Sequence, residues 1–317
     1  MAQPTPTRHV IVGAGPIGSA LARQLVAAGH HVTVVTRTGG PSRCGETRVA
    51  LDASDGDRLA AVAEGAAVLY NAANPADYHR WPEAWPPLAA SLRAAAERSG
   101  AVLATVGNLY AYGPVDRAMT EDLPLAATYT NGRIRAQMTR EAFAAHEAGR
   151  LQAVEVVASD YVGRGAYSHV NIAAESVLAG RTARVIGDPD QPHTWTGTED
   201  TARTLVAAAA DPTSYGRLWH VPSNPPRTQR EALTDLADVA GVPKPKVAGT
   251  PRSLLRVVGL VNKQMGAMLG TYYQFDRPFV MDDSAARAHF ALPHTPWREL
   301  LADSVDGIRT RTSATAA

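Results

Sequence analysis

The stretch HVIVGAGPIG, residues 9–18, decides how the rest of the chain folds. Its apolar start predicts a buried strand, which breaks directly into the glycine pattern GxGxxG and then into a helical pattern. In that setting the first glycine allows the tight turn, the second lets a pyrophosphate approach the backbone, and the third lets the helix pack closely on the strand. The stretch therefore predicts a dinucleotide-binding turn, with phosphate at the positive end of the helix.

Apolar and helical stretches alternate after the glycine turn. The predicted strands are 31–35, 49–51, 67–70, 102–106 and 153–157. This alternation favours right-handed crossovers and a mostly parallel sheet that helices cover on both faces. We therefore expect an α/β fold with a Rossmann-type doubly wound parallel sheet.

The point at which the alternation stops predicts the division of the chain. Its 317 residues are enough for two domains. The small polar residues at both ends are typical of flexible tails. The expected parts are an NAD(P)-binding domain at 8–165 with a return segment at about 190–222, a smaller C-terminal part at 166–189 and 223–310, and flexible tails at 1–7 and 311–317.

Composition excludes several classes of partner. The formal net charge is +1 and the arginines are scattered, so no basic surface for nucleic acid or membrane is predicted. The single cysteine, Cys44, excludes an internal disulfide and a thiolate metal cluster, and His193 has no second ligand at metal spacing. No long apolar region occurs at the start. We expect a cytoplasmic protein with a small-molecule substrate, no metal, and no nucleic acid or membrane partner.

The end of the second predicted strand bears on which dinucleotide binds. Rossmann proteins that bind NAD usually place a carboxylate about 20 residues beyond the glycines, where it binds the ribose 2′-hydroxyl. Here no Asp or Glu lies between Gly13 and Glu46, and Arg37 stands at the strand end. Because a guanidinium suits a 2′-phosphate, NADP is favoured, with NAD possible. The alternative is that Arg37 is a solvated loop residue.

Residues that follow the predicted strands complete the candidate site, because open parallel sheets bind ligands at the carboxyl ends of their strands. Asp55, by contrast, is expected to cap the next helix. The predicted cofactor-binding residues are Gly13, Gly15, Pro16, Ile17, Gly18, Arg37, Asp52 and Ala72. The predicted substrate-binding residues are His79, Tyr110, Asp160 and Tyr161.

Three of these substrate-binding predictions have structural alternatives. His79 lies in the aromatic and basic stretch 78–81, which is either a pocket wall or a loop packed by its own rings. Tyr110 is either a site residue or part of the core. Asp160 either binds a substrate hydroxyl or amine, or accepts hydrogen bonds from loop amides. A helix is expected after the aromatic stretch, at about 87–97.

The order of motifs along the chain resembles the extended short-chain dehydrogenases/reductases, the NAD(P)-dependent epimerase/dehydratase family. The motifs are the glycine loop, NAA at 71–73, YGP at 112–114, the helix opened by YTNGR at 129–133, DYVGRG at 160–165 and DTA at 200–202. The resemblance covers about residues 9–225. It implies an NAD(P)-dependent epimerase/dehydratase or reductase in which the part at 166–189 and 223–310 is a smaller C-terminal α+β substrate lobe. It also implies possible homodimerisation.

The family's catalytic residues match only in part. Members that move hydride with a Ser/Thr, Tyr and Lys set carry YxxxK, in which the lysine lowers the pKa of the tyrosine. This chain has Tyr129 and then Arg133 at that spacing, and Asn108 stands where the Ser/Thr is expected. The resemblance implies Tyr129 and Arg133 as an acid/base pair and Asn108 as the residue that positions the substrate oxygen. In the alternative, Tyr129 merely precedes a helix whose Arg133, Arg135 and Arg140 are surface charges.

These features predict NADP-dependent hydride transfer on a small organic carbonyl or alcohol. The incomplete set of catalytic residues keeps a second hypothesis open, a non-redox isomerase, cyclase or dehydratase on the same scaffold. A nucleotide-sensing regulatory protein is the third.

The longest periodic segment, 252–275, predicts a helix with Leu255, Val258, Val261 and Met265 on one apolar side. Its methionines and aromatic residues either cover a hydrophobic substrate or pack in a core or interface, and the second role is favoured.

Overall fold

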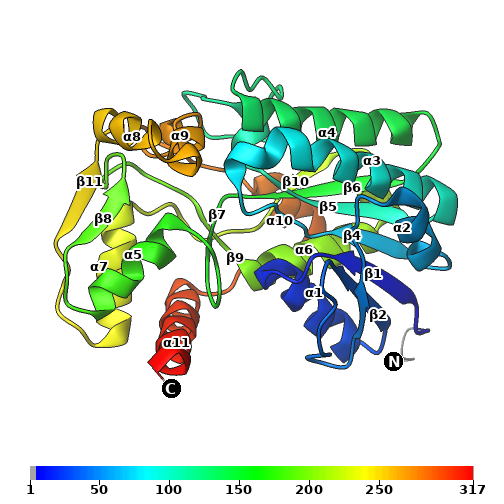
Figure 1. Cartoon of the computed structure of the whole chain (residues 1–317), viewed down its shortest axis with the longest axis horizontal. Coiled ribbons are helices and arrows are strands. Elements are labelled where there is room, and N and C mark those ends of the chain that lie inside the picture. Colours follow the sequence, from blue (N-terminus) through cyan, green and yellow to red (C-terminus); the bar gives the residue numbers. More distant parts are fainter. Residues whose placement is uncertain (1–4, 317) are drawn as a thin grey trace. The chain divides into compact units, whose positions relative to one another are not determined.

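A seven-stranded sheet carries the glycine loop (Figure 1). Its strand order is β10-β6-β5-β4-β1-β2-β3, and β1 lies between β2 and β4 with parallel pairing on both sides. The strands are β1 (Arg8–Val12), β2 (His31–Thr36), β3 (Thr47–Ala50), β4 (Val68–Asn71), β5 (Val102–Asn108), β6 (Ala153–Ala158) and β10 (Leu218–His220). This is the order of a Rossmann sheet with one strand added beside β6, so the predicted fold class is confirmed.

This computed structural model describes residues 5–316, with side chains as far as residue 312. The described chain divides into two compact units. The first unit comprises the residues up to 111, together with 130–157 and 201–219, and contains most of the seven-stranded sheet. The second comprises 112–129, 158–200 and the residues from 220 on. The segments 112–129 and 158–165 therefore belong to the second unit, whereas the sequence places both within the predicted domain at 8–165. The segment that returns to the first unit is 201–219, shorter than the predicted 190–222.

Helices cover both faces of the sheet (Figure 1). Apolar residues of β1, β4 and β5 that point to one face pack with α2, α3 and α4 in one core cluster. The opposite face carries α1 and α6 (Figure 1). The bounds are α1 (Pro16–Ala27), α2 (Gly56–Ala63), α3 (Trp81–Ser99), α4 (Thr130–Glu147) and α6 (Thr198–Ala210), with the short helices η1 (Tyr78–Arg80), η2 (Leu109–Tyr112) and η3 (Pro212–Ser214).

Helix α3 begins six residues before the expected start near residue 87. Trp81 and Trp85, one helical turn apart, are both fully buried, and their packing extends the helix toward its N-terminus. Pro82 lies in the first turn, where a missing N–H costs no hydrogen bond, but Pro86 and Pro87 lie inside the helix. The expected start at a proline was therefore wrong because burial of the two tryptophans outweighs that local signal.

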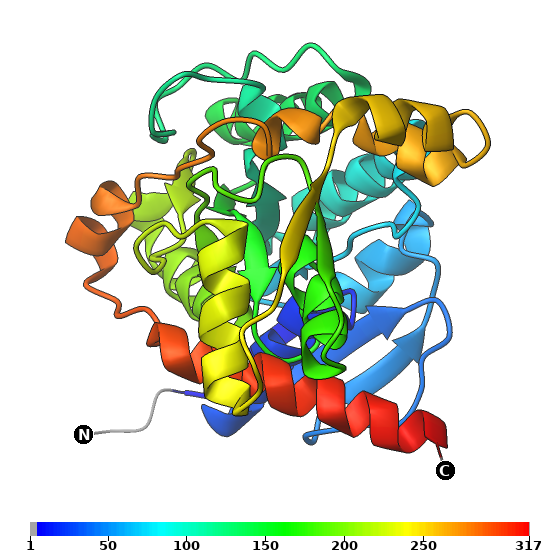
Figure 2. The same ribbon diagram turned by 90° about the vertical axis from the view of Figure 1, so that its left-hand side faces the viewer.

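Helices and two short parallel sheets surround the core of the second unit (Figure 2). In one sheet β11 (Val247–Thr250) pairs with β8 (Ala183–Ile186), and in the other β7 (Asp160–Val162) pairs with β9 (Trp195–Gly197). Helix α7 packs against both α5 and α11. The helices are α5 (His169–Leu178), α7 (Gln229–Ala240), α8 (Arg252–Gly259), α9 (Lys263–Met268), η4 (Tyr272–Gln274), α10 (Ser284–Phe290) and α11 (Trp297–Ala316).

The periodic segment 252–275 is not one helix but three short ones, α8, α9 and η4. Gly259 and Gly266 meet where α8 and α9 cross, since a Cβ atom on Gly259 would lie 3.0 Å from the Gly266 Cα atom. The apolar side predicted for this segment is wrong. Leu255 is fully buried, but Val261 is 90% exposed, because the chain turns between α8 and α9.

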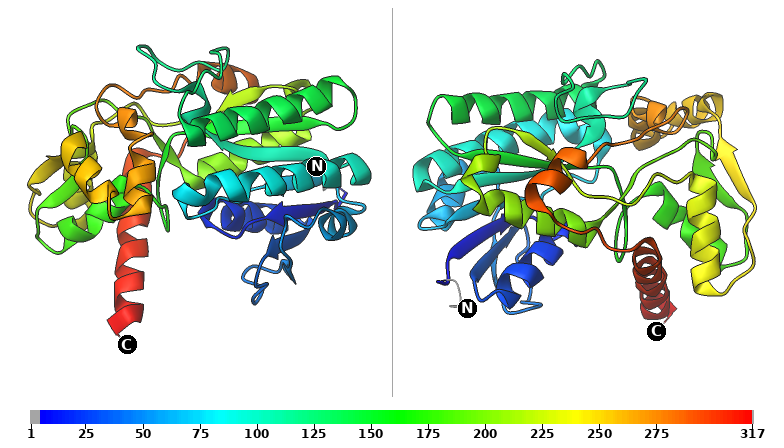
Figure 3. Two further views of the ribbon diagram at one scale, coloured as in Figure 1. Left: turned by 45° about the horizontal axis from the view of Figure 1, so that its top comes forward. Right: turned by 180° about the vertical axis from the view of Figure 1, so that it is seen from behind.

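The last helix, α11, runs without a break to Ala316 (Figure 3). The flexible tail expected from residue 311 is therefore helical as far as the structure describes it. Of the expected N-terminal tail, residues 1–4 lie outside the described residues, as does residue 317. None of the helices in the described part of the chain is long and apolar enough to cross a membrane.

Candidate functional site

The glycine loop has the backbone that close approach to a dinucleotide requires. Gly13 has a φ of +104°, and a Cβ atom there would lie 2.7 Å from the Ala72 carbonyl oxygen. A Cβ atom on Gly18 would collide with the carbonyl oxygen of Gly13, so helix α1 packs against the turn only because this residue is glycine. Gly15 is exposed, and a Cβ atom there would meet nothing within 4 Å. The space beside Gly15 is thus open and leaves room for a ligand to approach the backbone.

Helix α1 starts directly at this open side. Gly15 is its N-cap residue and Pro16 occupies the first turn, which contains no acidic residue. The half-buried Ile17 follows Pro16. The partial positive charge of the N-terminus is therefore not offset by a local carboxylate, which suits a diphosphate. The residues present fit a dinucleotide.

The loop after β2 is held together by a buried carboxylate, Glu46. The backbone N–H groups of Arg43 and Cys44 donate to it, and so does the Nε atom of Arg48 at 2.7 Å. Burial raises the pKa of Glu46, but the hydrogen bonds from Cys44 and Arg48 outweigh burial and hold that pKa well below its usual range. Glu46 therefore serves its own loop, while Arg37 at the end of β2 is exposed.

Asp52, the predicted cofactor residue after β3, is exposed and also bonded locally. The backbone N–H and hydroxyl of Ser54 donate to it, and these bonds, with the nearby charge of Arg37, hold its pKa below the usual value against a small effect of burial. Asp55 accepts a hydrogen bond from the Arg58 N–H at the start of α2. Its predicted role as a cap is confirmed.

Three predicted residues lie close to the carboxyl ends of β4 and β5. Asn108 ends β5, and its side-chain oxygen accepts a hydrogen bond from the Tyr110 N–H at 3.2 Å. The hydroxyl of Tyr110 lies 3.2 Å from that of Tyr78, whose ring stacks on Trp81. His79, beside Tyr78 in η1, is exposed. The structure thus places Asn108 and Tyr110 on one turn, next to an aromatic cluster.

A buried cation that the sequence analysis missed, Arg135 of α4, lies at the same strand ends. Its guanidinium donates to the Asn74 side-chain oxygen at 3.0 Å and lies 4.2 Å from the centre of the Trp85 ring. Arg133 and Arg140 on the same helix are exposed, so only Arg135 departs from the surface charges of the alternative hypothesis. No sequence signal marks it, because Asn131, Arg135 and Thr139 are polar residues at helical spacing, and only the structure shows that all three are buried.

A second missed residue, Glu155 of β6, is a carboxyl group buried in the same unit. The Thr139 hydroxyl donates to it at 2.8 Å, and a Cβ atom on Gly107 would collide with it. Burial raises its pKa to about 7, against the opposing effects of Thr139 and Arg135. Glu155 and Arg135 both line a cavity of about 20 Å³.

Tyr129, the predicted acid/base, is held by the C-terminal part of the second unit. Its hydroxyl lies 3.1 Å from the hydroxyl of Tyr273, and the two rings meet edge to face at 5.7 Å. A Cβ atom on Gly270 would lie 2.8 Å from the Tyr129 ring, so the ring also packs on the chain at that glycine. Burial raises the pKa of Tyr273 to about 12, so this hydroxyl keeps its proton.

Asp160 and Tyr161 are both half-buried at the start of β7. Asp160 forms an ion pair with His193, with 2.9 Å between its Oδ2 atom and Nε2 of the imidazole. Burial raises the pKa of Asp160, but His193 and the nearby His169 lower it, and the net effect is a lowered pKa. Tyr161 pairs in register with Thr196 of β9. The partner of Asp160 is thus the side chain of His193.

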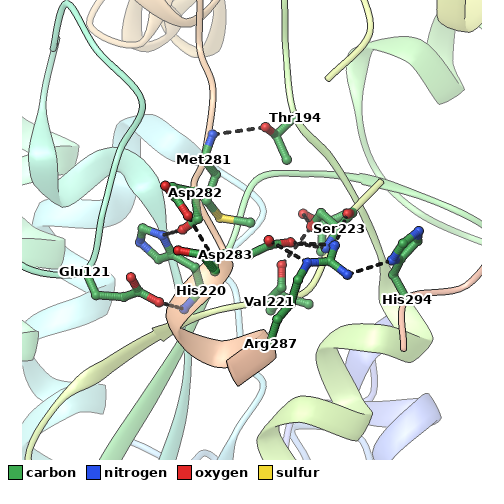
Figure 4. Close-up of polar contacts among 12 residues, drawn as sticks. Glu121, Thr194, His220, Val221, Ser223, Met281, Asp282, Asp283, Arg287 and His294 are labelled. Atoms are coloured by element: carbon green, nitrogen blue, oxygen red, sulfur yellow. Dashed lines mark hydrogen bonds and ion pairs between the residues drawn. The ribbon is translucent and has the colours of Figure 1, made fainter. Parts of the chain in front are cut away.

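The YGP motif anchors a polar network in the second unit. The Tyr112 hydroxyl lies 2.8 Å from Nε2 of the buried His220, whose Nδ1 atom is 2.7 Å from the Asp282 carbonyl oxygen. Glu121 accepts from the His220 backbone N–H (Figure 4). Figure 4 also shows Arg287 bonded to Asp283, Ser223 and His294. This arrangement gives the motif a structural role, beside a hollow of about 1110 Å³ that Tyr112 also lines.

With the glycine loop and its sheet in place, comparison with known proteins decides the family. A model of the NAD dependent epimerase/dehydratase family matches residues 9–219. The chain belongs to this family. The resemblance stated from the motifs is thereby confirmed, and so is the expected class of enzyme. A comparison with curated protein sequences finds no match.

Solved structures of epimerases and dehydratases share the fold over nearly the whole chain. The dTDP-glucose 4,6-dehydratase of Bacillus anthracis, solved with NAD, is 14% identical with a TM-score of 0.79, over 97% of this chain and 98% of that one. The UDP-glucose 4-epimerase of Thermotoga maritima, solved with UDP-glucose, is 15% identical with a TM-score of 0.78, over 96% and 100%. The UDP-glucuronic acid 4-epimerase of Bacillus cereus, solved with NAD, has the same identity and TM-score, over 96% and 99%. At these identities the likeness extends to the fold alone.

The structure brings some predicted site residues together and leaves others apart. Gly13, Gly18 and Ala72 meet at the glycine turn. Tyr129 pairs with Tyr273, whereas Arg133 is exposed on α4. The roles assigned to all of these residues stay predictions, as do the cytoplasmic location, the small-molecule substrate and the possible homodimer.

Proposed function

We propose that the chain binds a nicotinamide dinucleotide at the glycine loop and acts on a small organic molecule that bears a hydroxyl or carbonyl group. The observation that carries this proposal is the loop itself, tightly packed at Gly13 and Gly18 and open at Gly15. Two structures of the same fold were solved with NAD, which supports the class of cofactor. When bound, such a cofactor supplies or accepts a hydride.

NADP is the cofactor that the residues around β2 favour. Arg37 is exposed at the strand end, where its guanidinium is free to reach into solvent toward a 2′-phosphate. Glu46, the first carboxylate after the glycine loop, is buried in its own loop and unsuited to a ribose hydroxyl. The NAD in the structural relatives makes NAD the competing candidate.

In the proposed reaction Tyr129 exchanges a proton with the substrate oxygen. The Tyr273 hydroxyl keeps its own proton, so it is suited to donate a hydrogen bond to Tyr129 when Tyr129 is ionised. That bond supplies part of what a lysine supplies in the YxxxK pattern. Asn108 is proposed to orient the substrate oxygen.

A non-redox isomerase, cyclase or dehydratase is the second candidate. Two observations favour it. Arg133 is exposed, and the side-chain oxygen of Asn108 accepts a hydrogen bond from its own turn, so neither side chain is held in the position that hydride transfer requires. Under this hypothesis the dinucleotide is structural or absent.

Cofactor titration and turnover test the proposal together. We expect NADPH to bind more tightly than NADH. Arg37→Ala is expected to reduce the ratio of the two affinities about tenfold, the size of effect expected from loss of one charge-assisted contact. Equal affinities for the two cofactors in the unchanged protein would contradict the NADP assignment.

Turnover is followed through the absorbance of the reduced cofactor, with a panel of carbonyls, alcohols and nucleotide sugars. Tyr129→Phe is expected to lower kcat at least a hundredfold without weakening cofactor binding. Full activity of this variant would remove Tyr129 from the mechanism. Substrate conversion that continues after the cofactor has been removed would favour the second candidate.

A further inference from the structure

Exposed aliphatic side chains gather at helix α8 and the turn that follows it. Seven large hydrophobic side chains are exposed in the described part of the chain, and five of them fall within residues 254–261. These five are Leu254, Val257, Val258, Leu260 and Val261. Single exposed aliphatic residues need no explanation, but a contiguous group of this kind marks a surface that binds something.

Helix α8 is anchored to its unit by one face only. Leu255 is fully buried in a small core cluster, and Gly259, one turn later, packs against Gly266 of α9. The two helices lie side by side (Figure 1). The exposed aliphatic residues recur at spacings of three and four, which places them in one stripe along the helix: Leu254, Val257, Val258 and Val261. This stripe faces solvent, away from the buried face.

The same region carries an unopposed positive charge. No Asp or Glu occurs in residues 239–275, and because the formal net charge of the whole chain is only +1, the rest of the chain is net negative. The basic residues of this stretch are all exposed, and they are Lys244, Lys246, Arg252, Arg256 and Lys263. The last three belong to α8 and α9. The sequence analysis predicted no basic surface because the arginines of the whole chain are scattered, and it overlooked this local excess.

We propose that helix α8 and the turn after it dock on an anionic lipid surface. The aliphatic stripe enters the boundary between headgroups and acyl chains, and the long side chains of Arg252, Arg256 and Lys263 reach the lipid phosphates. A short helix with an aliphatic stripe and basic residues on another face is typical of helices that lie in a membrane interface. With eight residues, α8 is too short to cross a membrane, so the chain lies on the surface.

Two other occupants fit this surface less well. A second copy of the chain, related by a two-fold axis, would bring the same basic residues of both copies together, with no carboxylate of the stretch to pair with them. Nucleic acid supplies phosphates but no apolar phase to receive five aliphatic side chains. An anionic membrane supplies both.

Binding is measured by co-sedimentation of the full chain with vesicles of phosphatidylcholine, with and without phosphatidylglycerol. We expect binding only to vesicles that contain phosphatidylglycerol, and weaker binding at high salt, because salt screens exposed charges. The double variant Leu260→Asp, Val261→Asp is expected to lower the affinity roughly tenfold or more, since it replaces two aliphatic groups by charges that the lipid repels.

The charge is tested separately with Arg256→Gln. This residue is chosen because Arg252 also lies over the ring of Tyr272, at 5.8 Å from its centre. Loss of one basic group near the membrane is expected to lower the affinity for the anionic vesicles about fivefold.

Matched controls lie on helix α5 and just after it in the same unit. Ile172→Asp makes the same kind of change at an exposed aliphatic residue, and Arg181→Gln removes an exposed charge. Both are expected to bind the vesicles as the unchanged protein does. All the substituted side chains are exposed, so every variant is expected to fold, and thermal unfolding checks this.

Insertion is measured with Val261→Trp and vesicles whose acyl chains carry bromine, which quenches tryptophan fluorescence on contact. All five native tryptophans are buried, so quenching is expected for the added tryptophan alone. Quenching no greater than in the unchanged protein would overturn insertion of the stripe.

Three further results would overturn the proposal: no binding to anionic vesicles at low salt, equal binding to both kinds of vesicle, or binding that survives in the double aspartate variant. A dimer seen by light scattering without lipid, and dissociated by the double variant, would also overturn it, because a second copy would then cover the stripe. None of these results bears on the cofactor titration, which tests the proposed function separately.

Discussion

Glu155 is enclosed on every side within the first unit, with the Thr139 hydroxyl as a hydrogen-bond donor and Gly107 in contact. Arg135 and Thr139 both lie on the buried face of α4. At this scale the polar residues that matter are those that the fold removes from water. The burial of Glu155 makes the free energy of unfolding depend on the protonation of its carboxyl group.

Because Glu155 is buried, we predict that the free energy of unfolding falls as the pH rises through neutrality. Its pKa is about 7 in the folded chain against an ordinary value of 4.5, so folding favours the protonated form. The resulting stability is fully present below pH 4.5 and is lost as the pH rises through 7, by about 3 kcal/mol in total.

Glu155→Gln is expected to remove most of this pH dependence and to be the more stable protein at pH 8, as measured by urea unfolding at pH 5 and pH 8. The exposed Glu64→Gln is the control. Parallel stability profiles for the unchanged protein and Glu155→Gln would contradict the prediction.

Substitutions at Gly15 and Gly18 are expected to have different effects, one on cofactor binding and the other on stability. A methyl group on Gly18 meets the Gly13 carbonyl oxygen, so Gly18→Ala is expected to lower the free energy of unfolding by about 1–3 kcal/mol. A methyl group on Gly15 meets nothing in the free protein, so Gly15→Ala is expected to keep its stability and yet bind NADPH at least tenfold more weakly. Thermal unfolding and NADPH titration of both variants check this pair, and unchanged affinity in Gly15→Ala would place the cofactor elsewhere.

Secondary structure in this chain follows local signals except where burial of large side chains competes with them. Six strands of the central sheet, β1 to β6, occur close to their expected positions, because apolar runs are local properties of the chain. Helix α3 departs from expectation because Trp81 and Trp85 are buried one turn apart. The segment 252–275 departs because two glycines let α8 and α9 cross.

Helix α7 offers a quantitative test at the scale of one element. Thr228 and Glu231 form a capping box, in which the Thr228 hydroxyl accepts from the Glu231 N–H and the Glu231 carboxylate accepts from the Thr228 N–H. Thr228→Ala is expected to cost about 1 kcal/mol of unfolding free energy. Thr228→Ser keeps the hydroxyl and is expected to remain within a few tenths of a kcal/mol of the unchanged protein, by urea unfolding. Equal losses in the two variants would show that the hydroxyl is not what stabilises the helix.

The whole molecule is assembled from interleaved segments, because the chain passes between its two units several times. Segment 112–129 carries Tyr129 into the second unit, where Tyr273 holds it, although the helix that follows Tyr129 belongs to the first. The predicted acid/base is thus held by a residue that follows it by 144 positions in the sequence.

At this scale the proposed cofactor is expected to stabilise the protein by mass action. A ligand that binds only the folded state at a hundred times its Kd adds about 2.7 kcal/mol to the free energy of unfolding. We expect NADPH to raise the midpoint of thermal unfolding in a concentration-dependent way, and to do so less in Arg37→Ala. A midpoint that stays constant at saturating NADPH would contradict the dinucleotide site.

The sequence by itself determined the glycine turn, the doubly wound sheet and the family, because glycine spacing, apolar runs and short motifs are properties of local stretches of chain. Only the tertiary structure decided which polar residues gather. Arg135 reaches an asparagine 61 residues away, and Tyr129 pairs with a tyrosine 144 residues away. Asp160 pairs with His193 because β7 lies beside β9. Such contacts depend on how separate elements pack, and no periodicity within either partner encodes them.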